Sequence, residues 1–254
     1  MSQPIANTPS LQAVTESIIF PPGDDIYSDE PPLESDLHRE QIDLLIRLIK
    51  WWWRDHKDFY TTGNLTIYFS PNQKKSEEFR GPDFFVVLDT EKKDRKSWVV
   101  WQEDGKYPNV IIELLSNSTA SVDKGLKKQI YQNTFRTPDY FWFDPNNLEF
   151  QGFHLVDGQY QELVPTELGW LWSQQLGLYL AVYLGKLRFF TSDRELVMLP
   201  EEESNQQLEQ ANQQLEQANQ QLEQANQQLE QERQRTAILA ERLRNAGIDP
   251  NQIL

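Results

Sequence analysis

Apolar side chains recur at helical spacing in the first strongly patterned part of the chain. The positions are Leu37, Ile42, Leu45, Ile46 and Ile49. Their spacing predicts an amphipathic helix over residues 35–53, and Ser35 or Asp36 can cap its first turn. Residues 1–33 are instead rich in Pro, Ser, Asp and Glu, so we expect an extended N-terminal arm there.

Short apolar runs rich in β-branched and aromatic residues follow, and each is typical of a strand. We expect strands of this kind over residues 64–69, 83–88, 97–102, 110–115 and 139–144. Further short β segments are expected around residues 150–154, 161–163, 178–183 and 187–190. Continuous apolar runs indicate strands that are buried on both faces. With one more helix expected over residues 119–135, residues 34–200 are predicted to form an α/β domain with a mixed sheet.

The chain changes character beyond Pro200, where the heptad Asn-Gln-Gln-Leu-Glu-Gln-Ala repeats from Asn205. Leucine stands at every seventh position and alanine three residues later, which is the spacing of a coiled-coil seam. We expect a coiled-coil helix over residues 201–247 and a short tail over residues 248–254. The seam is expected to meet a partner helix, in a weak contact because alanine buries little area. The alternative is a repeat expansion that forms a solvated single helix.

The charge balance limits the classes of partner. Among 254 residues, 39 Asp and Glu outnumber 24 Lys and Arg, which gives a net charge of −15. Affinity from broad phosphate neutralisation is therefore not expected, and any contact with nucleic acid must be local. The absence of cysteine excludes disulfides and thiolate zinc sites, and three histidines far apart in sequence make a histidine zinc site improbable.

Targeting signals are not visible in the sequence. Residues 1–22 lack the basic region and apolar block of a signal peptide, and the chain has no run of 18 apolar residues. We therefore expect a cytoplasmic protein with no membrane contact.

Two acids stand inside or at the edge of apolar β runs, where an unpaired charge is expensive. Asp83 opens one run, and Glu113 lies in the middle of the run over residues 110–115. A carboxylate held there needs a cation, which is either a basic side chain or a metal ion. The alternative for either acid is a strand-end position that faces solvent or pairs with a basic residue.

The predicted helix after the Glu113 strand carries a third candidate. Asp123, Lys127 and Tyr131 are spaced by four residues, so they line one helix face. One interpretation is an ordinary surface ion pair between Asp123 and Lys127. The other is that this face packs over the sheet and places the ammonium group beside Asp83 and Glu113. Two carboxylates can hold Mg²⁺ or Mn²⁺, and a nearby lysine can orient water for phosphodiester hydrolysis.

Four blocks of sequence together resemble the Uma2 family of restriction-endonuclease-like proteins, which belongs to the PD-(D/E)XK nuclease superfamily. The blocks are residues 81–87, residues 108–119, the triplet Asp123, Lys127 and Tyr131, and residues 138–145. The resemblance covers about residues 30–200, and residues 239–250 also resemble the usual tail of the family.

The resemblance implies a restriction-endonuclease-like core, with a central mixed sheet flanked by helices and with Asp83 and Glu113 as ligands of Mg²⁺ or, as a substitute, Mn²⁺. The chain departs from the superfamily pattern because the lysine expected two residues after the glutamate is Leu115. Lys127 is the matching position in this family. An additional acid often joins such sites, and Glu34 is the candidate, with Glu40 as the alternate.

These residues lead to the hypothesis of a metal-dependent DNA endonuclease, with Asp83, Glu113 and Lys127 as its catalytic set. Two sites that cut two strands would make a homo-oligomer natural, through the core or the coiled coil. The alternative is a catalytically silent nuclease fold that acts as an assembly or binding protein through its coiled coil.

Two other features are open to a structural or a functional interpretation. Trp51, Trp52 and Trp53 could stack on bases, but a buried or interfacial cluster is the expectation. The basic stretch over residues 92–96 could touch a phosphate backbone, although a solvated turn is the default. Lys124 and Lys128 add positive charge beside Lys127.

Overall fold

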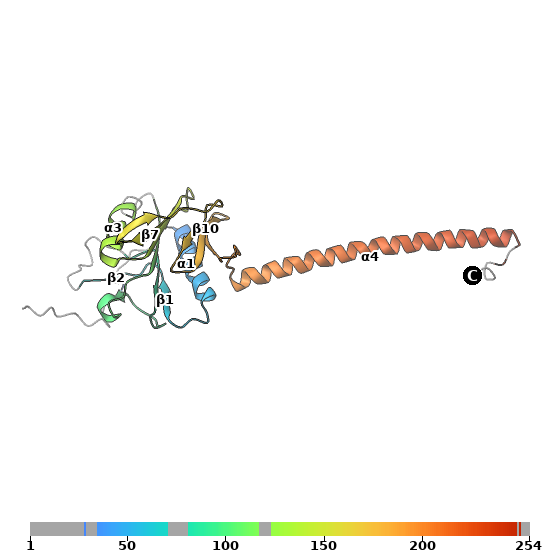
Figure 1. Ribbon diagram of the computed structural model, residues 1–254. Coiled ribbons are helices and arrows are strands. Elements are labelled where there is room, and N and C mark those ends of the chain that lie inside the picture. Colours follow the sequence, from blue (N-terminus) through green and yellow to red (C-terminus); the bar gives the residue numbers. More distant parts are fainter. Residues whose placement is uncertain (1–27, 29–34, 71–80, 117–122, 248, 250–254) are drawn as a thin grey trace, which may run out of the picture. The chain divides into compact units, whose positions relative to one another are not determined.

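The computed structural model describes residues 28, 35–70, 81–116, 123–247 and 249. The chain divides into two compact units, residues 1–197 and residues 198–254, and each is described by itself. The strands belong to the first unit, and the second contains one long helix (Figure 1). Within the described ranges, no helix combines the length and the apolar character needed to cross a membrane.

A six-stranded mixed sheet forms the centre of the first unit, in the order β1-β3-β5-β6-β7-β8. Its strands are Phe59–Thr62 (β1), Phe84–Leu88 (β3), Val110–Leu114 (β5), Asp139–Phe143 (β6), Phe150–Val156 (β7) and Gln159–Glu162 (β8). β5 and β6 run parallel, whereas the other neighbouring pairs run antiparallel. The predicted α/β class with a central mixed sheet is confirmed.

The three central strands are covered on both faces. Every residue of β5 and β6 is buried, as are the first four residues of β3. Their continuous apolar runs therefore match strands that have protein on both sides.

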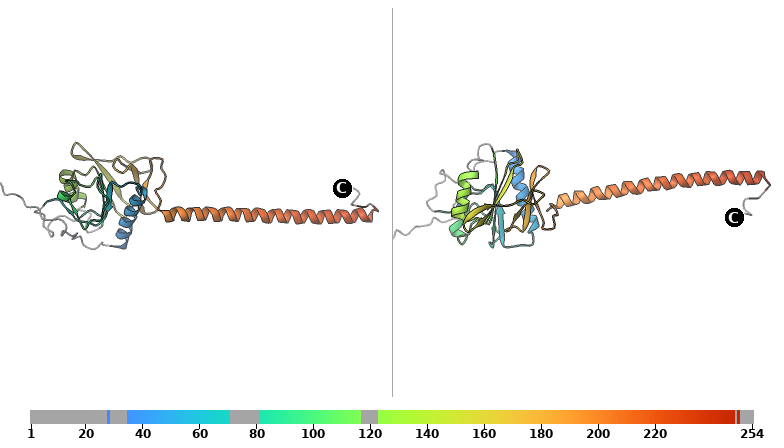
Figure 2. Two further views of the ribbon diagram at one scale, coloured as in Figure 1. Left: turned by 90° about the horizontal axis from the view of Figure 1, so that it is seen from below. Right: turned by 45° about the horizontal axis from the view of Figure 1, so that its top comes forward.

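One side of the central sheet is occupied by α1 (Asp36–Trp52) and a three-stranded antiparallel sheet (Figure 2). That sheet contains Leu171–Ser173 (β9), Leu178–Tyr183 (β10) and Lys186–Phe190 (β11). Ser35 caps α1 by accepting a hydrogen bond from the backbone N–H of His38. The side chain of Gln41 exchanges hydrogen bonds of 3.0 and 2.9 Å with the backbone of Leu187 and so ties α1 to β11.

The opposite side is covered by one helical segment, residues 123–135, which follows β5 in the chain (Figure 2). It comprises Asp123–Lys127 (η3), Lys128–Ile130 (α3) and Tyr131–Phe135 (η4), and its first and last parts are π-helical. Tyr131 and Phe135 pack into a core cluster with Ile67, Phe85, Val87, Trp98, Val100, Ile111, Leu115, Tyr140, Trp142 and Phe153. The predicted helix is confirmed from residue 123, while residues 119–122 lie outside the described ranges.

Two predicted strands are shorter than expected. Of residues 64–69 only Ile67–Tyr68 (β2) is a strand, because Asn64 adopts a left-handed conformation with φ 49° and turns the chain. Of residues 97–102 only Trp98–Val99 (β4) is a strand, which pairs parallel with β2 and ends in a 3₁₀ turn, Val100–Gln102 (η2). The sequence pattern also failed to predict β1 and β9.

The second unit contains α4, which spans Pro200–Asn245. Glu202 accepts a hydrogen bond of 2.8 Å from the backbone N–H of Leu199, so it caps the helix start. Acidic residues fill the first turn and arginines the last, which suits the helix dipole. The helix is confirmed, and its coiled-coil partner stays a prediction.

The two predicted terminal segments fall largely outside the described residues. Of residues 1–33 only Ser28 is described, and its backbone N–H donates to the Lys96 carbonyl at 2.9 Å. Of the expected tail, residues 248–254, only Asp249 is described.

Candidate active site

The pairing of β3 with β5 brings the two candidate carboxylates together. Phe84 pairs with Ile112, so in this antiparallel register Asp83 lies opposite Glu113. The backbone N–H of Asp83 is 3.4 Å from Glu113 Oε2. Asp83 Oδ2 in turn accepts a hydrogen bond of 2.8 Å from the backbone N–H of Leu114. Thirty residues apart in sequence, the two acids share one end of the sheet.

Glu113 is fully buried and is held by two side chains of the 123–135 segment. Lys127 Nζ lies 3.0 Å from its Oε2, and the hydroxyl of Tyr131 donates to its Oε1 at 2.5 Å. Lys127 is itself only 8% exposed, and Tyr131 is fully buried. The ammonium therefore reaches the carboxylate from the helical segment, and Lys127 is not an exposed surface residue.

Burial dominates the electrostatics of Glu113 and raises its pKa to about 8. The positive charge of Lys127 lowers this pKa, while the neighbouring charge of Asp83 raises it further. Without a further cation the site therefore favours a proton on Glu113 near neutral pH. A group that brings positive charge would stabilise the ionised form.

A tight turn supports the backbone of Asp83. The backbone N–H of Asn64 donates to the carbonyls of Pro82 and Asp83, at 3.1 and 3.2 Å. A Cβ atom added to Gly63 would lie only 2.3 Å from the Asp83 carbonyl oxygen and 2.4 Å from Ile42 Cγ2. The absence of a side chain at Gly63 is thus what lets α1 and this turn approach Asp83 so closely.

The remaining predicted site residues have different outcomes. Asp123 begins the 123–135 segment, but its side chain lies outside what the structure describes. Glu34 lies outside the described residues altogether. The alternate, Glu40, pairs instead with Lys186 Nζ, at 3.4 Å, at the turn between β10 and β11.

The two lysines beside Lys127 rest on aromatic rings of the central sheet. Lys124 Nζ lies 4.0 Å from the ring centre of Trp142 and 3.6 Å from Glu149 Oε2. Lys128 Nζ lies 3.4 Å from the ring centre of Phe153. Trp142 pairs with Glu113 across β5 and β6, so Lys124 is close to the site and can add positive potential there.

The basic stretch over residues 92–96 is largely neutralised within the fold. Arg95 makes a bidentate ion pair with Glu103, at 2.7 and 2.8 Å, and packs over the rings of Tyr60 and Trp98. Lys93 lies 3.6 Å from the same glutamate. These ion pairs indicate that the stretch stabilises the fold, and they argue against a role in binding a phosphate backbone.

The tryptophans at positions 51–53 are only partly packed against the fold. Trp53 makes an edge-to-face contact with Phe59, with ring centres 5.2 Å apart, and Arg54 covers the ring of Trp51. Trp52 is 40% exposed, so of the expected buried or interfacial cluster this residue is not buried.

A second polar cluster, which the sequence pattern did not predict, lies at the other end of β5 and β6. Asp139 begins β6, is fully buried, and accepts hydrogen bonds from three partners. These are His154 Nδ1 at 2.7 Å, Ser173 Oγ at 2.6 Å and the backbone N–H of Gln175 at 3.0 Å. The bonds link β6 to β7 and β9, which gives the cluster an anchoring role. Its sequence signal is the one that marked Asp83, an acid at the edge of an apolar run.

The oxygen donors of the site suit a hard divalent cation. Asp83 and Glu113 supply carboxylate oxygens, which Mg²⁺ and Mn²⁺ prefer, and the strand register sets the two residues opposite each other. Among the described residues no cluster of three Asp, Glu or His could hold a metal, so water and substrate oxygens would complete the coordination. The residues present thus fit the metal that the sequence analysis expected.

Comparisons with known proteins gave a family match and similar solved structures. The model of the Uma2 family, described as "Putative restriction endonuclease", matches residues 24–184. A solved structure described as "a putative nuclease belonging to DUF820", from Anabaena variabilis, is similar at 12% identity and a TM-score of 0.41. That match covers 58% of this chain and 76% of the other. The comparison with curated proteins gave no match.

Proposed function

The chain belongs to the Uma2 family, and from this membership and the site geometry we propose that it is a metal-dependent endonuclease that hydrolyses DNA phosphodiester bonds. Membership of this family supports nuclease activity. The observation that carries the finer proposal is the 3.0 Å contact between Lys127 and the buried Glu113, beside Asp83.

Each of the three side chains has a distinct task in this proposal. Asp83 and Glu113 would hold Mg²⁺, which when bound polarises a phosphate oxygen and lowers the pKa of a water molecule. An ammonium group carries three N–H donors, so Lys127 can hold Glu113 and also orient the attacking water or a phosphate oxygen. The Tyr131 hydroxyl fixes the rotamer of Glu113, since it donates to the oxygen that Lys127 does not contact.

Local positive charge is consistent with DNA as the substrate. The overall charge of −15 repels a polyanion at long range. Lys124, Lys127 and Lys128 nevertheless share one helical segment. Lys124 and Lys127 reach the sheet at Trp142 and Glu113, while Lys128 packs on Phe153. DNA contact is therefore expected to be confined to this segment and strongly sensitive to salt.

The proposal is tested by cleavage of supercoiled plasmid and single-stranded DNA with Mg²⁺ or Mn²⁺. Wild type should cut, and Glu113→Gln and Lys127→Met should lose about 100-fold or more of the rate. Lys186→Met is the matched control because it removes an exposed lysine that pairs with Glu40 outside the site. Equal cleavage by wild type and both site variants would contradict the assigned roles.

Metal binding can be measured separately from cleavage. A cation that binds only the folded protein raises its melting temperature, so Mg²⁺ or Mn²⁺ should stabilise wild type but not Asp83→Asn. A protein that neither cuts nor responds to these ions would instead favour the alternative, an assembly protein that keeps the nuclease fold.

A further inference from the structure

Helix α4 carries two apolar rows that the described fold leaves exposed. The leucine row is Leu208, Leu215, Leu222 and Leu229, continued by Thr236 and Leu243. The alanine row is Ala211, Ala218 and Ala225, continued by Glu232, Leu239 and Ala246. The four repeat leucines are 51–61% exposed, and no residue of α4 is buried.

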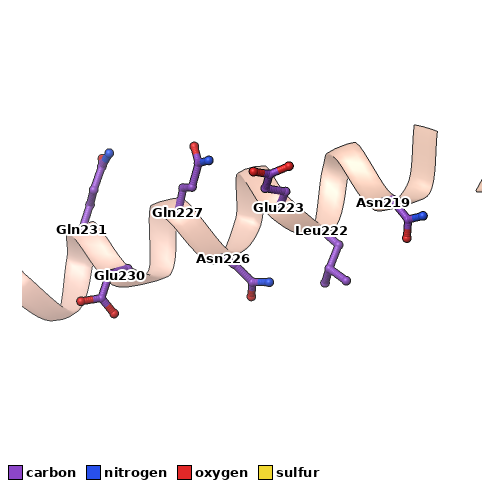
Figure 3. A pocket seen from close by; sticks show the side chains of 7 residues that line it. All are labelled: Asn219, Leu222, Glu223, Asn226, Gln227, Glu230 and Gln231. Atoms are coloured by element: carbon purple, nitrogen blue, oxygen red, sulfur yellow. The ribbon is translucent and has the colours of Figure 1, made fainter. Parts of the chain in front are cut away.

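The flanks of these rows are polar but uncharged over the repeats. Figure 3 shows Leu222 projecting from the same side of the helix as Asn219, Asn226 and Glu230, while Glu223 and Gln227 project from the opposite side. The repeat glutamates follow each leucine directly, so they lie away from the alanine row. On the side of the alanine row, a second helix can therefore approach the repeats without meeting charges.

We propose that α4 pairs in antiparallel orientation with α4 of a second copy of this chain. The proposal does not depend on the nuclease activity. Three features of the helix favour this occupant and this orientation, namely the sizes of the side chains in the two rows, the distribution of charge, and the position of Glu232.

The sizes of the row residues favour the antiparallel arrangement. Parallel helices in register would stack leucine on leucine and alanine on alanine, so the leucine layers would hold the backbones apart and leave the alanine layers underpacked. Antiparallel helices that overlap along their whole length place Leu222 opposite the partner's Ala225 and Leu229 opposite the partner's Ala218. The central layers, formed by Leu222 with Ala225 and by Leu229 with Ala218, then each have one large and one small side chain, which keeps the helix separation uniform there.

The charges of α4 are divided between its two ends. Residues 200–232 contain eight glutamates and no basic residue, whereas residues 233–245 contain four arginines and one glutamate. Parallel pairing would set like charges side by side at both ends. Antiparallel pairing sets the arginine-rich end of each helix beside the glutamate-rich end of its partner, which is attractive.

Glu232 adds a local argument because it occupies a position of the alanine row. In a parallel pair the two Glu232 carboxylates would face each other across the seam. In the antiparallel pair Glu232 lies opposite the partner's Leu215, so the two carboxylates are separated along the helix pair. The same residue is thus unfavourable in one orientation and tolerable in the other.

Introduced cysteines can test the orientation, because the natural chain has none. Full antiparallel overlap places Ser204 opposite the partner's Leu243. We expect full-length Ser204→Cys and Leu243→Cys to give no disulfide-linked dimer under mild oxidation, and the double variant to give abundant dimer. Linked dimers of the single variants would overturn the proposal in favour of a parallel pair. A monomeric mass of the wild-type chain by light scattering at about 100 µM would overturn it as well.

A charge swap provides an independent test that does not rely on cysteine. Arg242→Glu should weaken dimerisation about tenfold, because it places a glutamate within a turn of the partner's acidic first turn. Adding Glu203→Arg to the same chain should restore most of the affinity. Glu223→Arg, at the middle of the helix and away from both ends, is the control for a general change of net charge. Equal affinity of all these variants would contradict the charge complementarity.

Discussion

Lys127 Nζ lies 3.0 Å from Oε2 of Glu113, although the two residues belong to different elements and are fourteen positions apart. The position two residues after Glu113, directly after the end of β5, is taken by Leu115, which is fully buried. The ammonium group beside the carboxylate is thus supplied by the helical segment, while the strand side contributes an apolar side chain at position 115.

The shared proximity to Glu113 predicts that substitutions at positions 115 and 127 have non-additive effects on the free energy of unfolding. Leu115→Lys alone should lower the free energy of unfolding by about 2–4 kcal/mol, because it buries an ammonium near an existing one. In the Lys127→Met background the same change should cost at least about 1 kcal/mol less, since the new lysine can then pair with Glu113. Urea denaturation of the four chains measures this coupling, and purely additive effects would contradict it.

The raised pKa of Glu113 predicts a falling stability with rising pH. Its pKa is about 8 in the folded chain against an ordinary value of 4.5. Between these values the folded chain binds a proton that the unfolded chain has released, so the free energy of unfolding falls as pH rises. The slope is at most about 1.4 kcal/mol per pH unit.

Glu113→Gln cannot titrate and is the reference for this effect. Denaturation in the absence of divalent ions, between pH 5 and pH 8, should show wild type losing stability relative to Glu113→Gln. Parallel curves of the two chains over this range would mean that Glu113 is ionised throughout.

Tyr131→Phe should separate the positioning of Glu113 from the packing of the core. The change keeps the ring but removes the hydroxyl that donates to Glu113 Oε1. We expect a loss of about 1–2 kcal/mol in the free energy of unfolding. We also expect a lower cleavage rate with little change in the apparent affinity for DNA. Tyr160→Phe, which removes a hydroxyl that donates to the Thr137 carbonyl, should affect stability but leave the rate per folded molecule unchanged.

Gly63→Ala should impair the site without altering any of its side chains. The new methyl group would lie 2.3 Å from the Asp83 carbonyl oxygen, so the backbone of Asp83 must move. Cleavage and the Mg²⁺-dependent rise in melting temperature should both decrease. Gly125→Ala is the matched control, because an added Cβ there meets nothing within 4 Å and alanine favours the helix. A Gly63→Ala chain with wild-type activity would show that the turn does not position Asp83.

The sequence predicted the elements whose local and tertiary preferences agree. α1 has a periodic apolar face and a serine cap, and β3, β5 and β6 are continuous apolar runs between polar turns. The sequence also identified three site residues. Asp83 and Glu113 are acids at the edge of or inside an apolar run, and Lys127 lies on the face of the following helix that also carries Tyr131. Their proximity follows from strand register and from the return of the helical segment over the sheet, which are tertiary properties.

The elements that escaped prediction depend on their surroundings. β1 has four residues with an alternating pattern and gains its place by pairing with β3. β9 has three residues and is held through Ser173, whose hydroxyl donates to Asp139. Strands this short carry too little pattern to be distinguished from a loop. The Asp139 cluster likewise joins residues from three separate segments, so the acid at the edge of an apolar run is visible in the sequence but its partners are not.

The position of the Asp139 cluster allows stability and activity to vary separately. β5 and β6 begin beside this cluster and end beside Glu113, so one pair of strands has an anchored end and a reactive end. Substitutions at His154 or Ser173 would remove hydrogen bonds to Asp139 and so change the free energy of unfolding. They would not alter the residues that contact Asp83 and Glu113 at the other end. Mutations that stabilise or destabilise this fold can therefore accumulate at the anchored end before the chemistry changes, which leaves the reactive end free to evolve under selection for its substrate.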